Sequence, residues 1–169
     1  MMRAFRESGG TLEALAAGAP PESAVWIDLF EPGEAELAEI GRAAGARLPP
    51  RAEMEEIEIS SRLYQDGEAS YMTIVVPARA ASEAREVGPV TFVLTAAHLV
   101  TIRYHDPRPF ATYHARAGRT GYGCATAEAV LHGLLEDIID RLADILERIG
   151  ADMEALSQET FRAPRAENA

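Results

Sequence analysis

A long run of helical periodicity near the C-terminus constrains the fold more than any other feature of this 169-residue sequence. Between about Thr126 and Phe161, apolar residues recur at alternating steps of four and three, which is the spacing of one helix face. A helix of this length reaches roughly 50 Å, more than the core of so small a domain requires, so we expect it to pack against another helix or chain. The apolar positions are Leu131, Leu135, Ile138, Leu142, Ile145 and Ile149, with Leu134, Ile139, Leu146, Met153 and Leu156 expected to widen the same side.

The opposite side of this helix is acidic, with Glu136, Asp140, Asp144, Glu147 and Glu154 along it. Amphipathic helices commonly solvate such a face, so a solvent-exposed stripe is the favoured interpretation. The alternative is a weak cation-attracting surface, with Glu136, Asp140 and Asp144 as candidate metal ligands. Asp137 and Arg141 have the spacing of an i,i+4 ion pair. Gly133 and Gly150 are unfavourable inside a helix, so each either permits close packing or marks a bend.

The chain before this helix begins with a predicted strand-to-helix unit. Residues 24–30 are apolar and rich in large side chains, as in a buried strand. A helix should follow, with Pro32 at its first position and Gly45 at its end. Pro49 and Pro50 should then start a short acidic helix.

A hairpin and further strands complete the predicted sheet. Asp66-Gly67 is the strongest short-range hairpin signal in the chain, so the strands beside it should pair antiparallel. With the strand at 24–30, the sheet should hold at least five strands. The other expected elements are a short edge strand at 2–7, strands at 61–66, 69–78, 89–94 and 98–104, a mobile polar loop at 79–88, and a short helix at 107–117.

The composition restricts the class of ligand. A chain of this length with 47% hydrophobic residues is typical of one globular domain, and its net charge is −11. Because phosphate binding needs clustered cations, this balance argues against a nucleic-acid surface and favours cations as ligands. The single Cys124 excludes an internal disulfide and no signal-peptide pattern opens the chain, which fits a cytoplasmic setting. The most apolar window, residues 90–102, is too short to cross a bilayer as a helix.

A dense acidic segment covers residues 53–59, with glutamates at Glu53, Glu55, Glu56 and Glu58. Like charges three or four residues apart on a helix repel by about 0.2–0.5 kcal/mol per pair, so this charge requires compensation. A helix N-terminus, an arginine such as Arg51 or Arg62, or a metal ion would each provide it.

Several motifs follow one another in a specific order: Trp26-Ile27-Asp28-Leu29 before Pro32, Glu36 and Ile40; Met54-Glu55-Glu56-Ile57; Ser61-Arg62-Leu63-Tyr64 with Tyr71-Met72-Thr73; His98-Leu99-Val100-Thr101-Ile102-Arg103; and Leu134-Leu135-Glu136-Asp137-Ile138-Ile139-Asp140. Each motif consists of common residues, but their order and spacing are specific. Together they resemble the cytoplasmic N-terminal domain of CorA-type divalent-cation transporters, whose relatives include the ZntB zinc transporters. The resemblance covers nearly the whole chain.

The resemblance implies an α/β fold, an α/β/α sandwich around a mixed, largely antiparallel sheet. Residues 1–124 would form the cytoplasmic α/β domain, and residues 125–169 would begin a long amphipathic stalk helix that packs on it. The family's two C-terminal membrane helices, with the glycine-methionine-asparagine signature between them, do not occur in this sequence. We therefore expect a fragment of a longer homopentameric transporter, cut before its membrane segment, that lies at the cytoplasmic face of the bacterial inner membrane and binds no nucleic acid.

The resemblance also implies a metal-sensing site. In the family, carboxylates of the acidic segment face a neighbouring subunit's long helix, and magnesium between them holds the pore closed. Glu55 and Glu56 occupy the matching positions, Glu56 where the family has aspartate. The implied ligand is Mg²⁺, or alternatively Co²⁺, Ni²⁺ or Zn²⁺. Mg²⁺ suits a sparse ligand set because it keeps several waters and takes one or two carboxylates. The competing interpretation is that these glutamates only complement a helix N-terminus.

Three other functions compete with this hypothesis. A zinc-transporter domain would want Cys and His in close sets, whereas His98, His105, His114 and His132 are dispersed and expected at the surface. A purely structural oligomerisation domain would use only the long helix. An enzyme is not expected, because Cys124 lies in no recognisable nucleophile motif and adjacent carboxylates on a helix diverge by about 100°.

Overall fold

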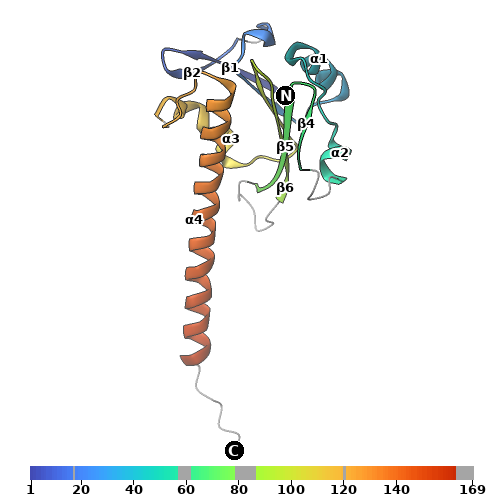
Figure 1. Ribbon diagram of the computed structural model, residues 1–169. Coiled ribbons are helices and arrows are strands. Elements are labelled where there is room, and N and C mark those ends of the chain that lie inside the picture. The colour runs from blue at the N-terminus through green and yellow to red at the C-terminus, as the bar shows by residue number, and fades with distance from the viewer. Residues whose placement is uncertain (17, 57–61, 79–86, 120, 163–169) are drawn as a thin grey trace, which may run out of the picture.

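The computed structural model describes residues 1–16, 18–56, 62–78, 87–119 and 121–162 (Figure 1). Its strands are β1 (Met2–Ser8), β2 (Thr11–Ala14), β3 (Trp26–Phe30), β4 (Leu63–Asp66), β5 (Ala69–Pro77), β6 (Val87–Leu94) and β7 (Leu99–Arg103). Its α-helices are α1 (Glu34–Ala44), α2 (Arg51–Glu56), α3 (Arg108–Thr112) and α4 (Ala127–Arg162). Short 3₁₀ turns occur at η1 (Pro21–Ser23), η3 (Tyr113–Ala115) and η4 (Ala117–Arg119).

The strands form one seven-stranded sheet in the order β2-β1-β3-β7-β6-β5-β4. Among the described strands, only β3 and β7 pair in parallel, from Trp26 opposite Leu99 to Phe30 opposite Arg103. Parallel neighbours need a long crossover, and here the crossover contains α1, α2 and three strands. The prediction of a mixed, largely antiparallel sheet is therefore confirmed.

Two glycine turns explain one correct prediction and one wrong one. Gly67, with φ of 60°, begins the two-residue turn between β4 and β5, as expected. Gly9 and Gly10, with φ of 58° and 82°, make a second tight hairpin, because a turn with positive φ at both central positions favours glycine. This hairpin adds β2, so β1 lies inside the sheet and the prediction of an edge strand at 2–7 was wrong.

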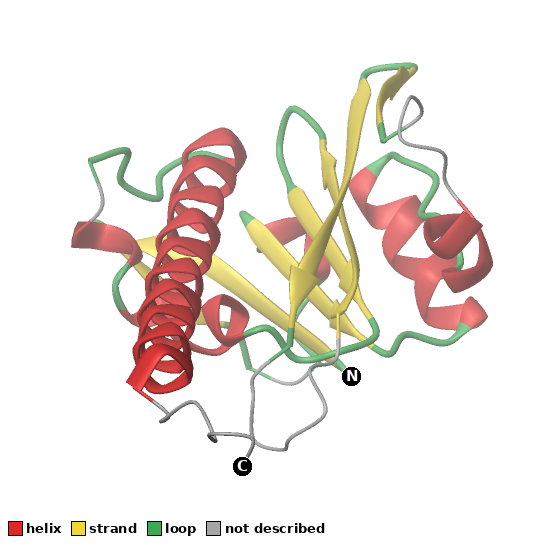
Figure 2. Ribbon diagram, turned by 90° about the horizontal axis from the view of Figure 1, so that it is seen from below, coloured by secondary structure: helices red, strands yellow, loops and turns green. Residues whose placement is uncertain are grey.

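Helices cover both faces of the sheet, which gives the expected α/β/α sandwich (Figure 2). On one face α1 and α2 bury Leu37, Ile40 and Met54 against Leu29 and Val93 of the sheet. On the other face α3 and α4 pack over a second core, in which Trp26, Phe92, Phe110, Tyr113, Val130 and Leu134 are all buried. The two cores are separated by the sheet itself.

The long helix α4 has the predicted extent but not the predicted apolar surface. Its first turns pack on the sheet, and its later turns project far beyond the domain (Figure 1). The buried side centres on Val130, Leu134 and Ile138. Leu134 extends this buried side as expected, whereas the other residues expected to widen it are not buried within this domain. These exposed residues are Ile139, Leu146, Met153 and Leu156.

The first glycine of α4 allows close packing, whereas the second does not serve that purpose. A Cβ added at Gly133 would lie 2.3 Å from the Tyr113 hydroxyl and 2.8 Å from its ring, so only glycine lets the helix approach this ring. A Cβ at Gly150 would meet nothing within 4 Å. The close-packing alternative is thus correct for Gly133 alone.

Other boundaries differ slightly from the predictions. Helix α1 begins at Glu34, after Gly33 as N-cap, so Pro32 precedes the helix rather than opening it, while Gly45 ends it in the left-handed conformation as expected. The predicted helix at 107–117 is divided into α3, η3 and part of η4. Most of the mobile loop expected at 79–88 falls outside the described residues, and its last two residues, 87–88, begin β6. Residues 57–61, which include the end of the acidic segment, also lie outside the described residues.

Candidate functional site

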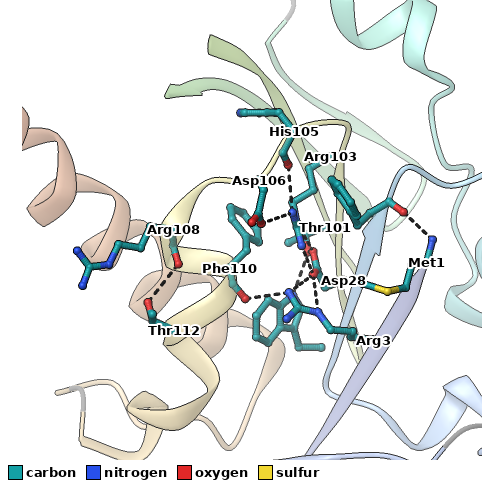
Figure 3. A network of polar contacts seen from close by, with 12 residues as sticks. Met1, Arg3, Asp28, Thr101, Arg103, His105, Asp106, Arg108, Phe110 and Thr112 are labelled. Carbon is teal, nitrogen blue, oxygen red and sulfur yellow. Dashed lines mark hydrogen bonds and ion pairs between the residues drawn. The ribbon is translucent and has the colours of Figure 1, made fainter. Parts of the chain in front are cut away.

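A buried charged network lies against the parallel strand pair β3 and β7, with Asp28 at its centre (Figure 3). Its carboxylate accepts hydrogen bonds from Arg103 Nε and Nη2, both at 3.0 Å, and from Thr101 Oγ1 at 3.0 Å. Arg3 Nη2 of β1 donates at 2.6 Å to the same carboxylate and at 2.9 Å to the backbone carbonyl of Phe110 in α3. Arg103 also donates at 3.0 Å to Asp106. Every charge here has a partner, as burial requires.

This network joins two of the motifs that were recognised separately in the sequence. Trp26 donates from Nε1 to the Thr101 hydroxyl at 3.1 Å, and Thr101 in turn donates to Asp28. Trp26 and Asp28 come from the first motif, whereas Thr101 and Arg103 lie on the adjacent parallel strand. Their shared role is structural, because they bind β1, β3, β7 and α3 to one another. Sequence analysis did not identify this role, although a charged residue in each of two apolar strands was a signal for it.

The acidic segment on α2 is neutralised by arginines in the described residues. Glu53 forms an ion pair with both terminal nitrogens of Arg47. Glu55 accepts a hydrogen bond of 2.6 Å from Arg51 Nε, one helical turn earlier. Arg51 was one of the two arginines expected to compensate this charge, and that expectation is confirmed. Among the described contacts no ion pair joins Arg62 to Glu53 or Glu55, and Arg47 was not expected as a partner.

Both α2 pairs are open to solvent. The side chains of Arg51 and Glu55 are 60% and 47% exposed, and ion pairs at such positions contribute little to stability. Hydrogen bonding from Arg47 holds the pKa of Glu53 below its ordinary value of 4.5. Hydrogen bonding to Glu55 likewise raises the pKa of Arg51. Glu56 ends the helix, and its side chain is not among those described.

Two of the three candidate carboxylates on α4, Asp140 and Asp144, lie near arginines. Glu136, Asp140 and Asp144 are exposed. Asp140 and Asp144 line an open pocket of about 450 Å³ between α3 and α4, together with Arg108, Arg116 and Arg141. Among the residues that the structure describes, no three His, Cys, Asp or Glu side chains come close enough to hold a metal ion.

A different ion pair anchors α4 to the domain. Asp137, which is buried, pairs with Arg116 of the segment between η3 and η4. The predicted pair between Asp137 and Arg141 is absent from the described contacts, and Arg141 instead lies 3.9 Å from Asp144. Local i,i+4 spacing was misleading here because Asp137 faces the domain, where a partner distant in sequence is available.

The two groups of candidate metal ligands lie on opposite faces of the sheet. Helix α2 packs through Met54 on the face of the sheet that holds Val93, and α4 packs through Leu134 on the face that holds Phe92. One copy of the chain therefore does not bring Glu55 together with the acids of α4. A site that uses both requires a second copy.

The described histidines do not favour zinc. His98 and His105 are buried, contrary to the expectation of surface positions. Their ring nitrogens lie 2.7 Å from the carbonyl of Ala24 and 2.8 Å from that of Val76, respectively. His114 stacks on Phe5, with the ring centroids 5.4 Å apart. These histidines are used in packing and in backbone hydrogen bonding.

The lone cysteine is equally unsuited to nucleophilic chemistry. Cys124 is buried in the core beneath α4, and this burial raises the pKa of its thiol. A reactive cysteine needs the opposite shift, because the thiolate is the nucleophile.

The donor chemistry of α2 fits Mg²⁺ better than a soft metal. Carboxylate oxygens are hard ligands, and Mg²⁺ takes only one or two of them while it retains water.

The helices of the described residues include none with the length and hydropathy of a membrane span.

Comparison with known proteins places these features in a family. The family model described as CorA-like Mg2+ transporter protein matches residues 21–169. The magnesium transport protein CorA of Escherichia coli strain K12 is 31% identical over 160 residues, which are 94% of this chain and 51% of that protein. CorA of Yersinia pseudotuberculosis is 29% identical over 160 residues, which again are 94% of this chain and 51% of that protein. The chain thus spans about half the length of these relatives.

Solved structures show the same fold. The soluble domain of CorA from Methanocaldococcus jannaschii aligns with a TM-score of 0.67 at 16% identity, over 95% of this chain and 64% of that one. The full-length CmaX protein aligns with a TM-score of 0.69 at 15% identity, over 98% of this chain and 53% of that one. From the family match and the shared architecture, the chain belongs to the CorA-like Mg²⁺ transporter family.

Proposed function

We propose that this chain is a regulatory, metal-sensing domain of a CorA-like magnesium transporter, in which Glu55 and Glu56 supply half of a Mg²⁺ site between subunits. The family is one of transporters and not of enzymes, in agreement with the sequence. The observation that carries the proposal is the position of Glu55. It lies half-exposed on α2, on an outer layer of the sandwich, where a carboxylate from a second subunit can approach it.

The other half of the site would come from the long helix of a neighbouring subunit. Because the acids of α2 and α4 lie on opposite faces of one chain, a shared site needs two copies in contact. Glu136, Asp140 and Asp144 are the candidate carboxylates on this helix, and all three are exposed. Residues 1–124 would act as the sensing domain and residues 125–169 as the start of the stalk helix.

Such a site would couple the cation concentration to subunit contacts. When Mg²⁺ is bound, its charge offsets the carboxylates of both subunits; when it leaves, like charges face each other and the contact loosens. The proposed assembly is a homopentamer at the cytoplasmic face of the bacterial inner membrane, with Mg²⁺, or Co²⁺ or Ni²⁺, as the sensed ion. The net charge of −11 also favours the attraction of cations.

Light scattering of the 169-residue chain tests the proposal. We expect the mean mass to rise when Mg²⁺ is added at millimolar concentration, and the double variant Glu55→Gln/Glu56→Gln to lose this rise. The matched control is Glu34→Gln/Glu39→Gln, which removes two exposed charges from α1 on the same face of the sheet and should respond like the parent chain. An unchanged mass of the parent chain with and without Mg²⁺ would contradict the proposal.

A purely structural role in oligomerisation is the second candidate, and the exposed apolar residues of α4 favour it. Ile139, Leu146 and Met153 recur every seven residues and are 63–68% exposed. Leu146→Gln/Met153→Gln distinguishes the two functions. If this variant abolishes association while Glu55→Gln/Glu56→Gln changes nothing, α4 assembles the protein and the acids of α2 do not sense metal.

The zinc alternative, a ZntB-like domain, has less support, because two of the histidines are buried against backbone carbonyls. Stoichiometric zinc binding that is lost on replacement of the exposed His132 would favour it.

A further inference from the structure

Arg51 contacts the carboxylate of Glu55, the group proposed to bind Mg²⁺. Arg51 Nε lies 2.6 Å from Glu55 Oε1, so the guanidinium occupies one of the two carboxylate oxygens that a metal ion could bind. A divalent cation that binds this oxygen must displace the arginine, because the two positive groups repel each other at such a distance.

The contact is strong enough to form and weak enough to exchange. The two residues are four apart with the arginine on the N-terminal side, which is the less favourable order for an ion pair on a helix. Both side chains are about half exposed, so water competes for each of them. The structure also provides the released arginine with a second partner, since its guanidinium carbon lies 5.1 Å from the centre of the Tyr104 ring.

The neighbouring pair provides a contrast. Arg47 and Glu53 have the same charges and similar exposure, but Arg47 is engaged through both terminal nitrogens, and no hydrogen bond or ion pair of the described residues joins it to Glu55. Its backbone carbonyl accepts a hydrogen bond from the hydroxyl of Tyr71, which fixes its position independently of its side chain.

We propose that Arg51 is an internal competitor of the divalent cation at Glu55 and sets the Mg²⁺ concentration at which this carboxylate becomes occupied. The inference rests on the proposed function, since it requires Glu55 to be a ligand. In the absence of Mg²⁺ the arginine neutralises Glu55. As Mg²⁺ rises, the ion takes the carboxylate oxygen and Arg51 remains against Tyr104.

Paramagnetic line broadening in NMR spectra tests this on the 169-residue chain. Mn²⁺ serves as the probe, at a trace concentration far below saturation, broadening the amide signals of residues 53–55, and Mg²⁺ is titrated in to reverse the effect, so that the midpoint follows the affinity for Mg²⁺. Arg51→Gln should lower the Mg²⁺ midpoint roughly three- to tenfold, because it removes both the ion pair and the repulsion of a doubly charged ion. Arg47→Gln is the matched control, with the same change of net charge on the same segment, and should leave the midpoint within about twofold.

Each result distinguishes the inference from the function on which it rests. An unchanged midpoint in Arg51→Gln, or an equal shift in both arginine variants, would overturn the inference while Glu55 remains a ligand. The variant Glu55→Gln should remove the local broadening. If it does not, Glu55 is not a ligand, and both the proposed sensor site and the competition by Arg51 are wrong.

Discussion

The network around Asp28 and the ion pairs of α2 use the same arginine–carboxylate chemistry in opposite surroundings. Asp28 and Arg103 are almost fully buried, and the carboxylate accepts hydrogen bonds from two arginines and a threonine. Glu55 and Arg51 are about half exposed and share one hydrogen bond. A buried pair is costly to break because it leaves a charge without water, whereas an exposed pair exchanges its partner for solvent. The first arrangement suits a framework and the second suits a regulated contact.

The largest expected effect is at the centre of the buried network. Asp28→Ala leaves Arg103 buried without its main counter-ion, so we expect a loss of about 3–5 kcal/mol in the free energy of unfolding. Urea denaturation measures it. Asp106→Ala is the control, because Asp106 is half exposed and its removal leaves the contact with Asp28 intact. Similar losses in the two variants would show that burial does not separate the two classes of ion pair.

The pair between Arg116 and Asp137 is an intermediate case that sharpens the comparison. The side chain of Asp137 is 5% exposed, whereas that of Arg116 is 50% exposed. Asp137→Ala should therefore reduce stability by about 1–3 kcal/mol, as measured by urea denaturation. Asp144→Ala removes an exposed acid two turns further along α4 and should change stability by less than about 0.5 kcal/mol. The reverse order would contradict the placement of α4 against the domain.

A smaller effect, dependent on pH, is expected for Glu53. The hydrogen bond from Arg47 lowers the pKa of Glu53 in the folded chain below its ordinary 4.5, so the pair stabilises the fold above that pH. This contribution is lost as the pH falls through the lowered folded-state value. Because both side chains are about half exposed, Glu53→Gln should cost less than about 0.5 kcal/mol at pH 7 and nothing in strong acid. Thermal unfolding of both chains between pH 7 and pH 3 measures the difference, and a gap that widens toward low pH would have the wrong sign.

The smallest effect on stability should come from Arg51→Gln. Its ion pair with Glu55 is exposed and in the less favourable helical order, so the free energy of unfolding should stay close to that of the parent chain. Denaturation of this variant in metal-free buffer checks the value. A loss as large as that of Asp137→Ala would mean that Arg51 belongs to the framework and is not an exchangeable partner of Glu55.

The elements that were predicted well are those with a strong local signal. The period of α4, the apolar strand β3, the Asp66-Gly67 hairpin and the end of α1 at Gly45 all depend on residues within a few positions of one another. The hairpin that contains β2 had a comparable signal in Gly9 and Gly10, and its omission made β1 an edge strand.

The candidate site was predicted only in part, because partners distant in sequence decide it. The positions of Glu55 and Glu56 on a short helix after Pro50 followed from the sequence. The pairing of Glu53 with Arg47, and the contact of Arg51 with Tyr104, needed the packing of α2 against the sheet. Whether the acids of α2 and α4 share a cation stays a prediction.

The sequence by itself determined the family, the order of most elements and the length of α4, since motif order and helical periodicity are properties of neighbouring residues. Only the tertiary structure decided that Asp28 meets Arg103 across 75 positions and that His98 and His105 are buried. It also decided that Asp137 faces Arg116 and that the acids of α2 and α4 lie on opposite faces of the sheet. Burial and charge pairing depend on which distant residues the sheet brings together, and no local pattern contains that information.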